Sequence, residues 1–424
     1  MLKNEFQLLE SNNFSQKVME KGSGSTEQLS SRGWHILSEE VSFPAAVIKE
    51  DALRNNANWM QKFSEHANVH LAPHGKTTMM PALFKLQLAH GAWGISLATV
   101  PQVVNAYRHG IKRIILANQL VGAYHFELIA DMLAQGDLDF YCFVDSIDNI
   151  KSLGQYFDRR NISLKLLLEI GVEGGRCGWR DTQNISPLIE AIKEYESLSL
   201  AGISFYEGVI HGSDALNTVE TFVRDVSALT NQLAKEALLS EDEFIVTGAG
   251  SAWYDVVAKQ FIANLDKDIN ITAIIRPGCY LIHDTGIYQQ AQQTIVNRSQ
   301  LACDISGELI SNLELWAYVH STPESGLAIV GLGKRDVAFD AGLPMPEYIY
   351  RPGNTQPTKV DEQWQVIQIM DQHCMVKVPE NASIKAGDLM CFSSSHPCLT
   401  LDKWRQVGLI DKNYVIRQTI ETYF

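Results

Sequence analysis

Short apolar runs recur through most of the first 280 residues of the chain, and longer segments of mixed polarity separate them. Runs of this length are typical of buried β-strands, and each intervening segment is long enough for a helix. Eight strands alternating with helices over a little more than 200 residues predict an α/β fold, a parallel (β/α)8 TIM-type barrel. The eight runs are Val69–Ala72, Trp93–Ala98, Arg113–Ala117, Phe140–Val144, Leu164–Ile170, Leu200–Tyr206, Phe244–Thr247 and Ala273–Arg276.

A doubly wound open sheet is the structural alternative to the barrel. No Gly-x-Gly-x-x-Gly motif follows the first strand, which disfavours its dinucleotide-binding version. Helix signals support the alternation in either case. Pro81 and Gly91 mark the start and end of one amphipathic segment, and Thr99 with Gln102 forms a capping box for another that ends at Gly110.

After about residue 290 the pattern changes to strand-like runs separated by Gly, Pro and polar turns. This predicts three regions: an N-terminal arm (1–40), a barrel (41–290) and a C-terminal β-rich domain (291–424), to which an N-terminal strand, Phe43–Ile48, could contribute. The linker is expected near 285–296. The predicted strands of the third region are Leu315–His320, Leu327–Val330, Val366–Met370, Met375–Val378 and Leu389–Ser393, closed by Tyr414–Thr422.

Composition narrows the classes of function. The chain has 424 residues and a net charge of −14, from 35 basic and 49 acidic residues, which disfavours general nucleic-acid binding. Neither a signal peptide nor an apolar run long enough to span a membrane is present, so we expect a soluble cytoplasmic protein without membrane partners. The seven cysteines are odd in number and widely spaced, which argues against a disulfide framework.

A lysine stands just past the end of the first predicted barrel strand, in the sequence Pro73-His74-Gly75-Lys76-Thr77. Lysine is nucleophilic only when neutral, and partial burial lowers its pKa toward that state. Lys76 is therefore a candidate catalytic amine, although on this stretch alone a solvated loop lysine is the alternative.

Other chemistry-bearing residues follow later strands, where the active sites of such barrels lie. Arg176 comes after the fifth strand and Tyr206 ends the sixth. The turn Thr247–Ser251 follows the seventh, and Arg276–Tyr280 follows the eighth. A Gly-Ala-Gly-Ser turn exposes N–H groups and a hydroxyl that suit a phosphate, although a plain tight turn has the same composition. A lysine, an arginine and a phosphate cradle on one face suggest pyridoxal phosphate held by Lys76 as a Schiff base.

These stretches, together with Tyr206-Glu207-Gly208 and Arg276-Pro277-Gly278, resemble the barrel of fold-type III pyridoxal-phosphate enzymes, the relatives of alanine racemase. Within that group the chain most resembles the D-serine dehydratase and D-threonine aldolase branch, over roughly residues 40–424. The resemblance implies an alanine racemase-like fold in which Lys76 carries the cofactor. It implies that Arg176 lies near the phenolic oxygen and Tyr206 near the pyridine ring. The phosphate is expected to be held by Gly248, Gly250, Ser251 and Tyr280, and Thr247 is expected to bind the cofactor as well.

A second element is Ser395-His396-Pro397-Cys398 in the β-rich region. An imidazole and a thiolate separated by one residue suit zinc, although a surface turn is the alternative for an isolated pair. In the D-serine dehydratases that the chain resembles, a His-x-Cys pair binds catalytic zinc, and the related aldolases have His-x-Asp. The resemblance therefore implies that His396 and Cys398 are metal ligands and favours the dehydratase.

The sequence thus predicts a zinc- and pyridoxal-phosphate-dependent lyase that acts on a D-3-hydroxyamino acid, with D-serine converted to pyruvate and ammonia. Retro-aldol cleavage to glycine and an aldehyde is the alternative reaction, and a non-catalytic pyridoxal-phosphate-binding protein is the alternative of another class. Gly75, Thr78 and Glu207 depart from residues common in the family and put the substrate in doubt. By resemblance, the chain is expected to form a homodimer.

Overall fold

A computed structural model describes residues 20–24, 33–237 and 243–424 of the chain. It divides into two compact units, a barrel unit (52–312, 395–402 and 422–424) and a β-rich unit that contains 313–394, 403–421 and the described residues up to 51. The expected N-terminal arm lies mostly outside the described residues. In the part of the chain that is described, every helix is too short or too polar to cross a bilayer.

The barrel unit contains an eight-stranded parallel sheet whose order is β2-β9-β8-β7-β6-β5-β4-β3. The two outer strands meet, because Trp93 N donates to Leu71 O over 2.7 Å and Ser96 N donates to Pro73 O over 2.9 Å. The predicted α/β barrel is confirmed. Its strands are β2 His70–Leu71, β3 Ile95–Leu97, β4 Arg113–Gln119, β5 Asp139–Val144, β6 Leu164–Ile170, β7 Leu198–Phe205, β8 Phe244–Gly248 and β9 Ile271–Ile275.

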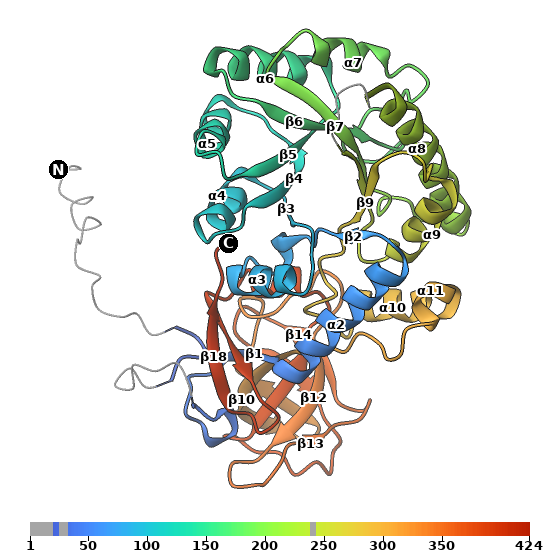
Figure 1. Ribbon diagram of the computed structural model, residues 1–424. Coiled ribbons are helices and arrows are strands. Elements are labelled where there is room, and N and C mark those ends of the chain that lie inside the picture. The colour runs from blue at the N-terminus through green and yellow to red at the C-terminus, as the bar shows by residue number, and fades with distance from the viewer. Residues whose placement is uncertain (1–19, 25–32, 238–242) are drawn as a thin grey trace, which may run out of the picture. The chain divides into compact units, whose positions relative to one another are not determined.

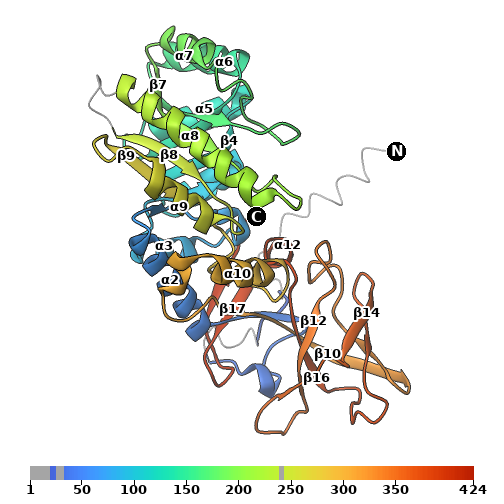
Figure 2. The same cartoon turned by 90° about the vertical axis from the view of Figure 1, so that its right-hand side faces the viewer.

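Helices cover the outside of this ring of strands (Figure 1). Helices α3 to α9 each follow a strand of the barrel; α8, for example, packs against β7 and β8 (Figure 2). The helices are α2 Glu50–His66, α3 Pro81–Ala89, α4 Val100–Arg108, α5 Ala123–Leu133, α6 Ile147–Arg160, α7 Ser186–Lys193, α8 Ala215–Ala237, α9 Tyr254–Asn264, α10 Ile287–Arg298 and α11 Gln300–Cys303.

The predicted helix boundaries are confirmed where capping residues mark them. Thr99 Oγ1 accepts a hydrogen bond from Gln102 N, and the Gln102 side chain accepts from Ala98 N just before the helix. Pro81 occupies the first turn of α3, where its missing N–H costs nothing. Inside the barrel, the strands bury a cluster of mostly branched and aromatic residues: Ala72, Ile115, Tyr141, Phe143, Leu167, Ile245 and Ile274.

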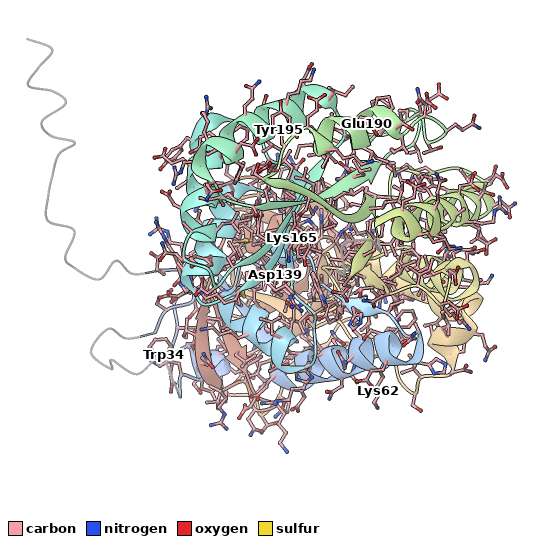
Figure 3. The ribbon with its side chains drawn as sticks, turned by 45° about the horizontal axis from the view of Figure 1, so that its top comes forward. Trp34, Lys62, Asp139, Lys165, Glu190 and Tyr195 are labelled. Atoms are coloured by element: carbon pink, nitrogen blue, oxygen red, sulfur yellow. The ribbon has the colours of Figure 1, made fainter. Side chains whose placement is uncertain are left out.

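Charged residues occupy the barrel at the start of β4, β5 and β6. The Asp139 carboxylate accepts from Arg113 Nε and from Lys165 Nζ, each over 2.8 Å. Figure 3 shows Asp139 and Lys165 side by side within the ring of strands. Arg113 also stacks over Trp93, with its guanidinium 4.7 Å from the ring centre. This network lies at the N-terminal ends of the strands, the end that serves stability rather than chemistry in such barrels.

The β-rich unit forms a sheet in which one inner strand comes from the N-terminal part of the chain. Strand β1, Ala45–Lys49, pairs antiparallel with β10 and parallel with β17. The sheet order is β13-β12-β16-β10-β1-β17-β18, and β11, β15 and β14 extend from β10. These strands are β10 Leu313–Glu324, β11 Leu327–Val330, β12 Met345–Tyr350, β13 Thr358–Lys359, β14 Gln365–Ile369, β15 Cys374–Lys377, β16 Leu389–Ser393, β17 Gln406–Ile410 and β18 Ile416–Glu421.

Two sequence-based expectations for this region are corrected. The expected linker at 285–296 is mostly helix α10, because Asp284 accepts hydrogen bonds from Gly286 N, Tyr288 N and Gln289 N and so caps a Gln-rich segment with little apolar periodicity. Strands β12, β13 and β17 were not expected. In addition, residues 395–402, with the short helix α12 (Cys398–Leu401), group with the barrel unit rather than with the β-rich unit.

Candidate active site

Lys76 lies in a short 3-10 helix, Gly75–Thr77, directly after β2. Gly75 allows this turn to pack closely, since a Cβ at this position would stand 2.7 Å from the Phe84 ring. Thr77 and Thr78, which follow Lys76, are buried, but Lys76 is exposed. The expectation of a partly buried lysine is therefore wrong, and the turn presents the amine to the open end of the barrel.

Lys76 lines a cavity at the C-terminal ends of the barrel strands. The cavity brings together six residues that the sequence predicted as site residues: Lys76, Arg176, Tyr206, Gly250, Ser251 and Cys398. It also contains eight that the sequence prediction did not assign to the site: His74, Thr77, Ala117, Ala249, Arg276, Gly278, Cys279 and Tyr288. Strands far apart in the sequence contribute to one face, as a closed parallel barrel requires.

Two arginines make this cavity electropositive. The Arg176 guanidinium lies 4.2 Å from the centre of the Tyr206 ring, over its face. Arg276 is buried and donates to Thr247 Oγ1 over 2.7 Å and to the Phe205 carbonyl over 2.8 Å. Burial lowers the pKa of Arg276 to about 10, so its charge persists at neutral pH. With the Lys76 amine, the cavity offers three cationic side chains to an anionic ligand.

The glycine turn after β8 is held by a buried carboxylate. Glu207 accepts from Ala249 N over 3.1 Å and from Gly250 N over 2.7 Å, and Ala249 adopts a left-handed φ of 67°. Burial raises the pKa of Glu207, while the two N–H donors and the nearby Arg276 act in the opposite direction. The sequence prediction offered these N–H groups to a phosphate, but in the structure Glu207 accepts from both.

Among the described residues, other parts of the predicted phosphate site lie outside the cavity lining. Thr247 accepts from Arg276, and Gly248 packs against Phe205, where a Cβ would stand 2.2 Å from the ring. Tyr280 is buried and its hydroxyl accepts from Gln87 Nε2 over 3.1 Å. Ser251 does line the cavity, and its Oγ accepts from Gly278 N and Cys279 N.

A pair of sulfur atoms lies beside the lysine turn. Cys398 Sγ is 3.4 Å from Cys279 Sγ and 3.4 Å from Thr77 Oγ1, and so one of the two predicted metal ligands stands next to Lys76. Hydrogen bonds from Cys279, His396 and Thr77 lower the pKa of Cys398 well below its usual range, although burial opposes them. His396 is half-buried, and its ring centre is 6.1 Å from that of Tyr288. A thiolate and an imidazole at this place suit a soft divalent metal.

The residues present fit a phosphorylated aldehyde cofactor. The Nδ1 atom of His74 is buried without a hydrogen-bond partner at the cavity wall, and an unpaired buried nitrogen is rare unless a ligand completes it. Burial and the cations Lys76, Arg276 and Arg176 lower the pKa of His74 well below its usual value. The cavity therefore offers groups that suit pyridoxal phosphate: a neutral imidazole, an accessible amine, an aromatic ring under a guanidinium, and a Ser hydroxyl.

Comparison with known proteins supports the same assignment. The family model described as "Alanine racemase, N-terminal domain" matches residues 48–281, and one described as "Putative serine dehydratase domain" matches residues 312–410. The first match covers more than half of the chain. The chain belongs to the alanine racemase-like family. Both matches together place it with the fold-type III pyridoxal-phosphate enzymes, in the D-serine dehydratase and D-threonine aldolase branch.

Curated relatives within this family are lyases by name. The D-threonine aldolase of an Arthrobacter species is 25% identical over 221 residues, which is 51% of this chain and 58% of that enzyme. The chain thus spans less than two thirds of that relative. The 3-hydroxy-D-aspartate aldolase of Paracoccus denitrificans is 22% identical over 355 residues, 82% of this chain and 85% of the aldolase.

Solved structures of the alanine racemase-like family share the fold. A D-threonine aldolase from Filomicrobium marinum has a TM-score of 0.74 at 21% identity and covers 92% of this chain and 97% of that one. A D-threo-3-hydroxyaspartate dehydratase, in a cysteine-to-alanine variant described as the metal-free form, has a TM-score of 0.68 at 19% identity, covering 92% and 99%.

Several residues of the cavity were not predicted from the sequence of this chain. The Arg276-Pro277-Gly278 stretch was recognised as a motif, but only the fold shows Arg276 beneath the cavity. Cys279 and Tyr288 carried no local signal, since a lone Cys and a Tyr are ordinary core residues. Asp145, Glu169 and Cys177 have ligand atoms within 4.8 Å of one another, yet Glu169 already accepts from Gln119 and Asp145 from Gly178 N.

Proposed function

We propose that this protein is a pyridoxal-phosphate- and zinc-dependent lyase that eliminates water from a D-3-hydroxyamino acid, with D-serine as the first candidate substrate. The observation that carries the proposal is the position of Cys398, whose sulfur lies 3.4 Å from the Thr77 hydroxyl and lines the same cavity as Lys76. The amine that we propose as the base and the sulfur that we propose as a metal ligand line the same cavity. The lyases named among the relatives are consistent with this class.

The proposed cofactor would be held by residues of one cavity. Lys76 would bind it covalently, Arg176 and Tyr206 would contact its ring, and the Ser251 hydroxyl would contact its phosphate beside Gly250, whose N–H donates to Glu207. When bound, pyridoxal phosphate supplies an electron sink for the charge that develops at the substrate α-carbon. Arg276 contributes a buried positive charge that favours the anionic cofactor, and it keeps that charge because its pKa is about 10.

The protein's own side chains would carry out the proton transfers. The Lys76 amine removes the α-proton as general base, a contribution that is typically ~10²–10⁴-fold in rate. Thr77 stands next to it and holds Cys398 by a hydrogen bond, which fixes the distance between the base and the metal ligands. His396 and Cys398 would bind zinc, which supplies a Lewis acid for the departing β-hydroxyl group.

The aldolase reaction is the second candidate, because three curated relatives are named as aldolases. It requires a base that deprotonates the β-hydroxyl, so that the bond between Cα and Cβ breaks and glycine and an aldehyde form. The identity of the metal ligand favours dehydration, since the chain has Cys398 where the related aldolases have an aspartate. The two reactions leave different products from the same substrates.

A product assay tests the proposal. The purified protein is incubated with D-serine, D-threonine and D-threo-3-hydroxyaspartate, and keto acids, ammonia and aldehydes are quantified. Keto acid and ammonia are expected, and Lys76→Ala should abolish both. If aldehyde and glycine form instead, the protein is an aldolase and not a dehydratase. A bound cofactor without turnover of any substrate would support the non-catalytic alternative.

A covalent-labelling experiment tests the cofactor separately. Borohydride reduction followed by peptide mapping should place the reduced cofactor on Lys76. Modification of a different lysine, or of none, would contradict the assignment whatever the assay with D-amino acids shows.

The proposal keeps two expectations from the sequence, a homodimer and a cytoplasmic location. A second chain is not needed to bring Cys398 to the cavity, because residues 395–402 group with the barrel of the same chain. The dimer therefore rests on family resemblance alone, and sedimentation of a stable, fully active monomer would disprove it.

A further inference from the structure

Cys279 and Cys398 are 119 residues apart in the chain, yet their sulfur atoms are 3.4 Å apart. A disulfide would require about 2.05 Å. Two thiolates bound to one tetrahedral zinc, each at about 2.3 Å, would be separated by about 3.8 Å. The observed separation is thus close to that of two ligands on one cation.

The surroundings of Cys279 are not those of a cysteine that only fills a core. Thr77 Oγ1 contacts its sulfur at 3.6 Å, and the Tyr288 hydroxyl forms a hydrogen bond with it. Cys279 is 3% exposed but lines the cavity that also contains Lys76. Cys142 in β5 shows the contrast, because burial alone raises the pKa of its thiol.

The backbone also holds Cys279 in place. It follows β9, and its N–H donates to Ser251 Oγ over 3.2 Å, as does that of Gly278. The sulfur is therefore carried by the rigid end of a barrel strand, where a ligand needs no loop to be ordered. Cys398 starts helix α12, and Thr77 bridges to both sulfurs.

We propose that Cys279 is a third protein ligand of the catalytic metal, which gives a donor set of Cys279, Cys398 and His396. This inference rests on the zinc site of the proposed function and deepens it. Three protein ligands with one open position is the arrangement of catalytic zinc sites, and the open position would receive the substrate hydroxyl. Two thiolates also favour a soft metal such as zinc over magnesium or manganese.

Cobalt substitution tests this inference without an activity assay. Wild-type protein and the variants Cys279→Ser, Cys398→Ser and Cys142→Ser are freed of metal under reducing conditions and titrated with Co²⁺. The intensity of the near-ultraviolet sulfur-to-cobalt band reports the number of bound thiolates. We expect Cys279→Ser to retain about half of the wild-type intensity and to bind at least about tenfold more weakly, and Cys142→Ser to match wild type.

X-ray absorption at the zinc edge tests the same point on unmodified protein, so that a folding defect of a variant cannot mislead. Two sulfur neighbours at about 2.3 Å are expected. One sulfur neighbour, or full band intensity and affinity in Cys279→Ser, would overturn the role of Cys279 and leave the proposed function standing. Failure of wild-type protein to bind either metal would overturn the metal site itself and this inference with it.

Discussion

At the scale of single residues, Glu207 shows how a site can depend on a side chain that does not line it. Its buried carboxyl group accepts two N–H groups of the turn that precedes Ser251, so Glu207 holds the cavity wall in shape. A buried carboxylate with these donors is costly to alter, because an unpaired buried N–H costs about 1–3 kcal/mol.

Glu207→Gln tests that role. The amide oxygen can accept one of the two N–H groups, but the amide NH₂ must then face the other. We expect cofactor affinity to fall by roughly tenfold, which corresponds to about 1.4 kcal/mol. Titration with pyridoxal phosphate, monitored by absorbance, measures this affinity. Glu190→Gln on the exposed face of α7 is the control, and equal affinities for the two variants would contradict the role.

At the scale of elements, the barrel depends on close approach between strands β7 and β8. Gly202 allows it, because a Cβ there would stand 2.0 Å from the Ile245 carbonyl oxygen. The pairing of β6 with β7 also shifts register next to this residue, which marks a bulge. A backbone atom cannot move aside as a side chain can.

Gly202→Ala should therefore destabilise the barrel by about 3 kcal/mol or more, since it forces two paired strands apart. Thermal unfolding of the cofactor-loaded protein measures the effect. Gly136→Ala is the matched control: its φ of 77° is left-handed, but a Cβ would meet nothing within 4 Å. If Gly202→Ala lost less thermal stability than Gly136→Ala, the close contact between β7 and β8 would not be what requires glycine at this position.

The β17–β18 hairpin depends on Asp411, which accepts from Asn413 N and Val415 N and pairs with Arg417. Although partial burial opposes them, these donors together lower the pKa of Asp411. A lowered carboxyl pKa contributes stability above the unfolded-state value of about 3.9, and that stability is lost as pH falls through the folded-state pKa.

Asp411→Asn keeps an acceptor oxygen but loses the charge. We expect a loss of up to about 1 kcal/mol at pH 7 that stays constant down to about pH 5 and shrinks below pH 4. Thermal midpoints of both proteins across that range measure the difference. If the difference between the two thermal midpoints grew as the pH fell, the lowered pKa of Asp411 would be contradicted.

At the scale of the whole molecule, the β-rich unit is built from both ends of the chain. Strand β1 separates β10 from β17, and its residues Ala45–Ile48 are fully buried. Removing β1 would expose unpaired edges on both neighbours, and such edges promote aggregation.

A chain that begins at residue 50 should therefore lose the fold of this unit. Hydrogen exchange is expected to reveal unprotected amides across β10 and β17, and limited proteolysis should cleave there. A chain that begins at residue 20 keeps β1 and all of its pairings and serves as the control. Protection equal to that of the control would show that the other strands hold the sheet alone.

The sequence by itself determined the local parts of this protein. Apolar runs of the right length indicated all eight barrel strands, and Thr99, Pro81 and Gly110 marked helix ends, because periodicity and capping act over a few residues. Lys76 and Arg176 could be placed at strand ends for the same reason. The segments missed, such as α10, have weak periodicity and depend on a partner side chain, here the cap from Asp284.

Only the tertiary structure decided which of these parts meet. It places Cys279 beside Cys398 and assigns the N–H groups of the glycine turn to Glu207. It also turns Tyr280 away from the cavity toward Gln87. Contacts across 42 to 193 residues depend on how the closed sheet and its helices pack, and no local pattern encodes them. The sequence marked Lys76, Arg176, Tyr206, Gly250, Ser251 and Cys398, but it gave neither the other residues that line the cavity nor the partners of these side chains.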